Sequence, residues 1–242
     1  MENVIVSGGA GGIGSAIVRE LKENGYNPIV IDNDKNNCEK IKKELNLENV
    51  WCVDITDVEG LQKFCNSLPD AFSIDHIVSL AGRAMENEWK PFGEQDIKEI
   101  RKSIEINLIG HINIVHTFLK RLKKSLAYNK SVTFISSINA FGDFGLPAYS
   151  SCKSGLYGLV KSLCSEFGQD KIRINSVSPG TIVTPATEKE PKNFEELKKG
   201  TAIGDFATKE EIASTVRFIM ETHGITGQNF VIDAGQSTIL KK

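Results

Sequence analysis

Tyr149 and Lys153 lie four residues apart near the start of an expected helix, and Ser136 and Ser137 end the apolar run that precedes it. Residues at this spacing share one helix face, so their side chains are close enough to interact. A phenol with a pKa of about 10 is a poor base at neutral pH, and a nearby ammonium lowers that pKa. A serine hydroxyl can hold the oxygen of a carbonyl or alcohol in place while the tyrosine gives or takes its proton. These residues predict proton transfer at such a group, but they include no hydride carrier.

Tyr157 and Lys161 have the same spacing two turns further along the helix. Ligands of α/β sheets bind beyond the carboxyl ends of the strands, where the next helices begin. Tyr149 occupies that position and Tyr157 does not, so we expect the second pair to be structural.

A hydride carrier is indicated by the glycine-rich turn SGGAGGIG, which lies between an apolar run and a helical pattern. Glycines let the backbone approach a pyrophosphate, and the free N–H groups of a helix N-terminus attract its charge. The next apolar run ends at Asp32. Its carboxylate can accept hydrogen bonds from the adenosine ribose of NAD and would repel the 2′-phosphate of NADP. We therefore expect NAD as the cofactor, rather than NADP.

Strand-like and helix-like segments alternate along the chain. The expected strands are 4–6, 28–31, 50–53, 74–78, 132–135, 172–177 and 229–232. The expected helices include 35–45, 57–68, 95–124, one from Pro147 and one at 209–221. This alternation is typical of an α/β fold with a doubly wound parallel sheet. No linker or short repeat divides residues 1–242, which predicts a single domain.

Composition excludes several classes of function. The net charge of −2 over 242 residues gives no reason to expect nucleic acid or membrane binding. No apolar run approaches the roughly 20 residues that span a bilayer, and a strand begins too early for a signal peptide. The five cysteines lack metal-ligand spacing, so we expect free thiols, no metal site and a cytoplasmic location. His111 and His116 are expected to be structural, because no carboxylate–histidine spacing accompanies them.

Together, these motifs resemble the short-chain dehydrogenase/reductase family from Val4 to about Gly235. The matching stretches are SGGAGGIG (Ser7 to Gly14), CVDITD (Cys52 to Asp57), LAG (Leu80 to Gly82), EINLIG (Glu105 to Gly110), the Ser–Tyr–Lys block, RINSVSPGTIVTP (Arg173 to Pro185) and ITGQNFVIDAG (Ile225 to Gly235). The resemblance implies a Rossmann-type sheet of seven parallel strands. It also implies oxidation or reduction of an alcohol/carbonyl pair with a nicotinamide cofactor, and a homo-oligomer, commonly a tetramer.

The resemblance also implies residue roles. Tyr149 would give or take the proton, Ser137 would position the substrate oxygen, and Lys153 would bind the nicotinamide ribose and lower the phenol's pKa. Asn107 would hold a water in a proton relay to Lys153. The implied cofactor site consists of Gly8, Gly12, Ile13, Gly14, Asp32, Asp54, Ile55, Leu80, Ala81, Gly82, Tyr149, Lys153, Pro179, Gly180, Ile182 and Thr184.

Two departures from the family pattern affect this site. Leu80 replaces the usual asparagine, which removes a polar tie beside the fourth strand. The family serine usually precedes the tyrosine by 13 residues, which would select Ser136, whereas Ser137 precedes it by 12. Strand alternation lets only one of the two point into the site. We choose Ser137, as the second serine at the strand end, and assume a loop one residue shorter.

The substrate itself is not identified. Its pocket walls are expected from 83–92, 142–146 and 185–205, the last a charged segment with Phe194 and Leu197 at helical spacing. The favoured function is an NAD-dependent oxidoreductase acting on a small alcohol or carbonyl. An NADPH-dependent reductase of carrier-bound 3-oxoacyl groups is one alternative, although the basic run at 120–124 is expected to be a solvated helix end. A non-catalytic nucleotide sensor or scaffold is the other.

Overall fold

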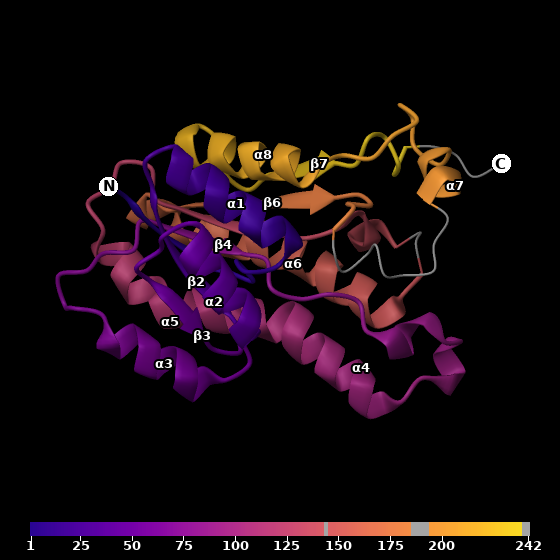
Figure 1. The fold of residues 1–242 in the computed structure, drawn as a ribbon, viewed down its shortest axis with the longest axis horizontal. Coiled ribbons are helices and arrows are strands. Elements are labelled where there is room, and N and C mark those ends of the chain that lie inside the picture. Colours follow the sequence, from indigo (N-terminus) through magenta and orange to yellow (C-terminus); the bar gives the residue numbers. More distant parts are fainter. Residues whose placement is uncertain (143–144, 185–193, 239–242) are drawn as a thin grey trace.

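The apolar runs of the sequence form seven strands of one parallel sheet, in the order β3-β2-β1-β4-β5-β6-β7. The computed structural model describes residues 1–142, 145–184 and 194–238 (Figure 1). The strands are β1 (Asn3–Ser7), β2 (Asn27–Asp32), β3 (Val50–Cys52), β4 (His76–Ser79), β5 (Ser131–Ile135), β6 (Arg173–Pro179) and β7 (Asn229–Ile232). Every neighbouring pair is parallel. The predicted seven-stranded, doubly wound α/β fold is confirmed.

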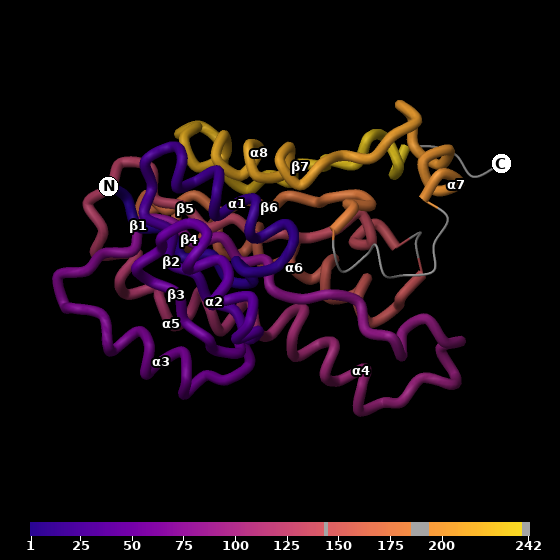
Figure 2. Tube along the Cα trace, viewed as in Figure 1, coloured from indigo at the N-terminus to yellow at the C-terminus, as the bar shows by residue number. Residues whose placement is uncertain are grey.

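Helices cover both faces of the sheet, with α1 and α8 side by side on one of them (Figures 1 and 2). The α-helices are α1 (Gly12–Glu23), α2 (Lys35–Glu44), α3 (Val58–Ser67), α4 (Ile97–Ile104), α5 (Gly110–Lys124), α6 (Pro147–Phe167), α7 (Phe194–Lys198) and α8 (Lys209–Glu221). Shorter helical segments are η1 (Glu86–Trp89), η2 (Phe92–Glu94), η3 (Glu105–Ile109), η4 (Ile138–Phe141) and η5 (Gly168–Asp170). Among the described residues, no helix is long and apolar enough to cross a membrane.

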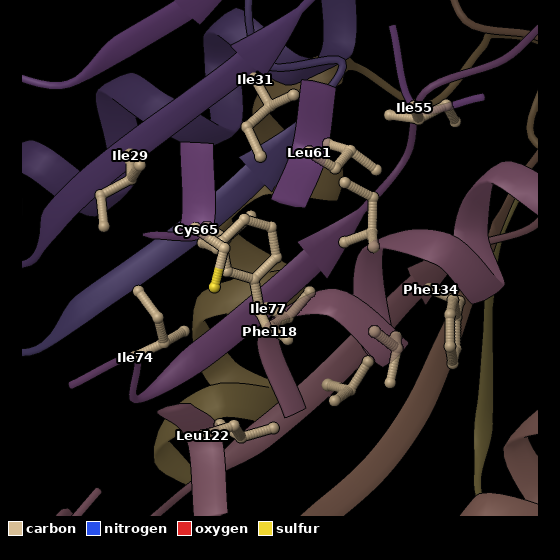
Figure 3. Packing of buried hydrophobic residues seen from close by; sticks show 14 of the residues in the cluster. Ile29, Ile31, Ile55, Leu61, Cys65, Ile74, Ile77, Phe118, Leu122 and Phe134 are labelled. Atoms are coloured by element: carbon tan, nitrogen blue, oxygen red, sulfur yellow. The ribbon is translucent and has the colours of Figure 1, made fainter. Parts of the chain in front are cut away.

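Two apolar clusters anchor these layers to the sheet. One cluster lies between the sheet and α3, α5 and α6 (Figure 3). There Phe64 of α3 stacks on Trp51 at 4.3 Å between ring centroids and meets Phe118 of α5 edge-on at 5.5 Å. The other cluster joins the opposite face to α1 and α8, through Val18 and Val216 among others. Because both faces are buried, the strands read as nearly continuous apolar runs.

The sheet changes its winding direction at β1. This strand pairs with β2 on one side and with β4 on the other, so the chain winds outward in opposite directions from it. Open α/β sheets bind ligands at such a switch point, beyond the carboxyl ends of the strands. Ser7, Asp32 and Ser79 end β1, β2 and β4 at that position.

The helix predicted over 95–124 contains an irregularity. Its axis continues through α4, η3 and α5, but η3 is a π-helical segment with Asn107 at its centre. Gly110 follows this segment, where a Cβ atom would collide with the Ile55 side chain. Such π segments accommodate one extra residue and are frequent at functional sites.

At the amino edge of the sheet, two arginines bind backbone carbonyl groups. Arg121 donates hydrogen bonds to the carbonyl oxygens of Cys65, Leu68, Pro69 and Phe72, where α3 ends. Arg173 donates in the same way to Ile219, Met220 and Ile225, where α8 ends. The basic run that contains Arg121 therefore includes a structural helix cap as well as solvated lysines.

Candidate functional site

The glycine turn brings β1 close to the end of β4. Gly8 has a φ of +72°, and a Cβ there would lie 2.8 Å from the Cα atom of Ala81. At Gly12, a Cβ would lie 2.7 Å from the Cβ atom of Thr184, and at Gly14 it would collide with the carbonyl oxygen of Gly8. Side chains at these positions are excluded by space. The turn leaves backbone N–H groups at the start of α1, which has no side-chain cap and no acidic residue in its first turn.

Asp32 supports this turn from the end of β2. One carboxylate oxygen accepts the N–H of Ala10 at 3.1 Å, and the other accepts the N–H of Asp34 at 3.1 Å. A half-buried carboxylate thus lies beside the glycine turn. It provides negative charge where the sequence predicted contact with an adenosine ribose.

Asp54 lies beside a cavity of about 380 Å³ at the same edge of the sheet. Although burial raises the pKa of Asp54, hydrogen bonds from Thr56 and Asn33 outweigh it and hold the pKa below its usual value. The cavity is lined by Asp54, Thr56, Arg101, Lys102, Glu105 and Ile106. Its position suits the adenine expected near Asp54.

Leu80 departs from the family pattern without leaving a buried polar group. Its backbone N–H donates to the carbonyl oxygen of Ser7 at 3.3 Å, and its side chain packs against the apolar cluster under α1 and α8. At Leu80, an apolar contact therefore replaces the polar interaction that the family's asparagine makes at this position. Gly82, two residues on, adopts a φ of +131°, and a Cβ there would collide with the Asn107 side chain.

Tyr149, Lys153 and Ser137 come together between β5 and the first turns of α6. The Ser137 hydroxyl lies near enough to the Tyr149 phenol to lower its pKa. The Lys153 ammonium nitrogen lies 5.5 Å from the centroid of the Tyr149 ring and donates to the carbonyl oxygen of Ile135 at 3.0 Å. The structure thus assembles the three predicted groups at one place.

Ser136 points elsewhere. Its buried hydroxyl donates to the carbonyl oxygen of Lys153 at 3.0 Å and fastens the strand end to α6. The Ser137 hydroxyl donates to Asn139 Oδ1 at 3.1 Å, and its oxygen accepts the N–H of Asn139 at 3.2 Å. Of the two serines, Ser137 is the one that affects the pKa of the Tyr149 phenol.

Burial dominates the ionisation of the tyrosine and the lysine. It raises the pKa of Tyr149 to about 12, against a smaller lowering by the Ser137 hydrogen bond. It also lowers the pKa of Lys153 to about 8. Lys153 is not among the groups that lower the pKa of Tyr149, and burial disfavours the charged forms of both side chains.

Asn107 is fully buried with half of its amide unsatisfied. Its Nδ2 donates to the carbonyl oxygens of Arg83 and Ser103, each at 3.0 Å, whereas its Oδ1 has no partner. A buried acceptor without a partner is costly in protein interiors. It suits the water that the sequence analysis expected Asn107 to hold.

His111, one turn further, is also fully buried. Its Nδ1 lies 2.7 Å from the Ser79 hydroxyl, which lies 3.3 Å from that of Ser7. Burial, with a smaller contribution from the Lys153 charge, lowers the histidine's pKa well below its usual value. The predicted structural role agrees with this polar contact across β1 and β4, although no sequence pattern indicated that Ser79 would be its partner.

The remaining predicted residues lie at the ends of β6 and β7. Pro179 ends β6, and a Cβ at Gly180 would lie 2.7 Å from that of Asp233. The N–H of Thr181 donates to Gln236 at 2.9 Å, and Ile182 is buried. This connection carries Thr184 to the glycine turn, where it faces Gly12.

Tyr157 and Lys161 have structural partners. The Tyr157 hydroxyl lies 2.6 Å from that of Ser178, and Lys161 donates to the carbonyl oxygen of Gly227 at 2.5 Å. Both contacts tie α6 to the β6–β7 side of the sheet, as the prediction for this pair requires.

The expected substrate walls are described in part. The loop after β4 provides η1 and η2, and Phe194 of α7 meets Phe206 edge-on at 6.2 Å. Residues 143–144 and 185–193 lie outside the described residues. Within the described part of the chain, no group of three or more His, Cys, Asp or Glu residues is arranged to hold a metal ion.

Comparisons with known proteins agree with this geometry. Residues 8–237 match a family model described as enoyl-(acyl carrier protein) reductase. Carbonyl reductase family member 4 of Xenopus laevis is 29% identical, over 95% of each chain. The 3-oxoacyl-(acyl-carrier-protein) reductase of Thermotoga maritima is 28% identical, over 96% of each chain. A solved oxidoreductase of Burkholderia thailandensis, titled as short chain dehydrogenase/reductase family, is 30% identical and has a TM-score of 0.86, covering 97% of this chain and 92% of its own.

Proposed function

Because the chain belongs to the short-chain dehydrogenase/reductase family, we propose that it is an NAD-dependent oxidoreductase that interconverts a secondary alcohol and a ketone. One observation carries the proposal: Ser137, Tyr149 and Lys153 meet beside the switch point of the sheet. The proton-handling groups and the glycine turn thus lie at the same edge.

The residues present fit a dinucleotide. Substituting Gly8 or Gly12 would fill the space under the turn, the start of α1 has no side-chain cap, and the Asn107 acceptor is unsatisfied. The glycine turn would hold the pyrophosphate, Asp32 the adenosine ribose, Asp54 and Ile55 the adenine, Lys153 the nicotinamide ribose, and Ile182 and Thr184 the carboxamide side. Bound there, the dinucleotide supplies the hydride donor or acceptor.

The chain's own groups then handle the proton. During reduction, Ser137 donates a hydrogen bond to the carbonyl oxygen and Tyr149 gives it the phenolic proton. During oxidation, the tyrosine oxygen accepts the proton of the alcohol. Lys153, whose ammonium nitrogen lies 5.5 Å from the centroid of the Tyr149 ring, would bind the nicotinamide ribose. A water held by Asn107 Oδ1 connects Lys153 to further proton exchange.

The preference for NAD is supported by Asp32. Its carboxylate is held in place by two backbone N–H groups, so it cannot easily withdraw from a ribose or from a 2′-phosphate. The Asp32 carboxylate and a 2′-phosphate would repel each other more strongly where bulk water is excluded. The preference for NAD therefore follows from charge.

A second candidate is an NADPH-dependent reductase of carrier-bound 3-oxoacyl groups. The Thermotoga maritima relative and the matching family model carry acyl-carrier names. Arg101 and Lys102 also bring positive charge to the cavity beside Asp54. Against it, the basic run around Arg121 lies at the opposite edge of the sheet and includes a helix cap.

We further propose a cytoplasmic homo-oligomer with a small-molecule substrate and no nucleic acid or membrane partner. Exposed Ile97, Ile104 and Ile112 on α4 and α5 support association through these helices. A non-catalytic sensor or scaffold is disfavoured because all four residues expected to handle the proton are present, namely Asn107, Ser137, Tyr149 and Lys153.

The test is a titration with NADH and, separately, NADPH, followed by energy transfer from Trp51 and Trp89. We expect NADH to bind more tightly than NADPH, and Asp32→Asn should reduce this difference in affinity. Alcohols and ketones are then screened with the preferred cofactor. Tighter NADPH binding would favour the acyl-carrier alternative, and binding of neither would favour the scaffold.

A further inference from the structure

Glu88 is a buried carboxylate beside the candidate active site, and only 3% of it is exposed. It lies in η1, in the connection between β4 and α4. Its Oε2 accepts the backbone N–H of Tyr149 at 2.7 Å, and its Oε1 accepts the Ser103 hydroxyl at 2.6 Å. Oε1 also accepts the N–H of Met85 at 3.3 Å. One side chain thereby connects η1, α4 and α6.

The contact with Tyr149 satisfies a free helix end. The first N–H groups of a helix lack partners within it, and α6 has no side-chain cap at Leu146. Glu88 supplies the missing acceptor from 61 positions away in the chain. A carboxylate is well suited to this position, because a helix N-terminus attracts negative charge and charge-assisted hydrogen bonds are strong.

The other oxygen connects Glu88 to Asn107. The Ser103 hydroxyl that donates to Glu88 accepts the Asn107 Nδ2 at 3.2 Å, and the Ser103 carbonyl oxygen accepts the same nitrogen at 3.0 Å. A hydrogen-bonded path therefore runs from Asn107 through Ser103 and Glu88 to the backbone of Tyr149. Burying a carboxylate is costly unless it is hydrogen-bonded, and this path satisfies both oxygens.

We propose that Glu88 is a positioning residue that holds Tyr149 in place relative to Asn107 and puts a negative charge near the phenol. The inference rests on the proposed function, in which Tyr149 handles the proton. Two titratable side chains are affected by the charge of Glu88. They are Tyr149 and Cys152, both on α6, and Glu88 adds to the effect of burial in raising the pKa of each. Lys153, which follows Cys152, is the cation of the same helix turn.

The experiment compares Glu88→Gln with Glu86→Gln. Glu86 is an exposed acidic residue of the same η1 segment, so its variant removes a charge without touching the path. In the free protein, 13Cζ-labelled tyrosine resonances are followed from pH 8 to about pH 12.5, so that the range includes the Tyr149 pKa of about 12, with Tyr149→Phe used for assignment. We expect the Tyr149 resonance to titrate at lower pH in E88Q than in wild type and in E86Q. An unchanged Tyr149 titration in E88Q would overturn the proposal.

Kinetics provide the second measurement. In alcohol oxidation, the pH-independent maximum of kcat should fall about tenfold in E88Q, because small displacements of a catalytic group are costly, while the Kd for NADH stays within about twofold. If E88Q does not fold, Ser103→Ala breaks the path and keeps the charge, and a wild-type kcat would then refute the positioning role. The NMR titration needs no substrate or cofactor, so a protein without dehydrogenase activity would refute the proposed function while Glu88 is still tested.

Discussion

Ser136 and Ser137 are neighbours at the end of β5, yet their hydroxyl groups serve different partners. Ser136 donates to the carbonyl oxygen of Lys153, whereas Ser137 donates to Asn139 Oδ1 and lowers the pKa of Tyr149. Alternation along an extended chain turns the two hydroxyl groups in different directions.

Exchanging each serine for alanine separates these roles. Ser137→Ala should lower kcat by roughly 10² to 10³, the usual effect of removing one donor to a reacting oxygen, with little change in unfolding temperature. Ser136→Ala should lower the unfolding free energy by about 1 kcal/mol and keep most activity. Steady-state kinetics and thermal unfolding of both variants provide the check. The reversed pattern would assign the catalytic role to Ser136.

Tyr149→Phe removes the phenolic proton and little else. NADH affinity should stay nearly unchanged, and turnover should fall by about 10² to 10⁴ on any substrate. Tyr157→Phe is the matched control, because it removes a phenol on the same helix whose hydroxyl lies 2.6 Å from that of Ser178. Near-normal turnover in the Tyr149 variant would exclude the proposed mechanism.

Lys153 should make stability depend on pH. Its pKa is about 8 in the folded protein and about 10.4 in an unfolded chain, so between these values the unfolded chain binds more protons. Stability therefore rises with pH across that window. Relative to Lys153→Met, the wild type should gain on the order of 3 kcal/mol between pH 8 and pH 10.5, at about 1.4 kcal/mol per pKa unit. Urea unfolding of both proteins at several pH values measures this, and parallel curves would contradict it.

Gly8→Ala should abolish NADH binding. The substitution meets the backbone of Ala81 at 2.8 Å and strains a positive φ, which costs roughly 1 to 2 kcal/mol by itself. Gly25→Ala provides the control, because Gly25 has a φ of +83° and nothing within 4 Å of its added Cβ. That variant should be destabilised by the strain alone and still bind NADH. Equal affinities of Gly8→Ala and Gly25→Ala for NADH would show that the glycine turn does not bind the cofactor.

Much of the fold was predictable because the parallel strands are buried on both faces. The run 132–135, for example, was predicted within one residue of the bounds of β5, in which every residue is buried. The glycine turn and the four-residue spacing of Tyr149 and Lys153 are local patterns, so they too can be found without a structure. Strand alternation indicated that only one of Ser136 and Ser137 would point into the site, but not which one, and the family spacing pointed to Ser136.

What sequence patterns could not predict depends on distant contacts. Glu88 lies in an irregular segment without periodicity, and its role is visible only from Tyr149 and Ser103. The π-helical segment at Asn107 gave no local signal beyond two poor helix formers, Asn107 and Gly110. The raised pKa of Tyr149 results from burial, which an isolated Tyr–Lys spacing does not reveal.

The two arginines at the amino edge of the sheet have a consequence for how such a protein can diversify. Arg121 and Arg173 bind eight carbonyl groups there between them (Cys65, Leu68, Pro69 and Phe72; Asn129, Ile219, Met220 and Ile225), at the edge farthest from the reacting groups. Loops at the carboxyl edge can then change in length and composition without loosening these fastenings. Substrate preference can thus diverge at the carboxyl edge of the sheet while the arginine contacts at the amino edge keep the fold stable.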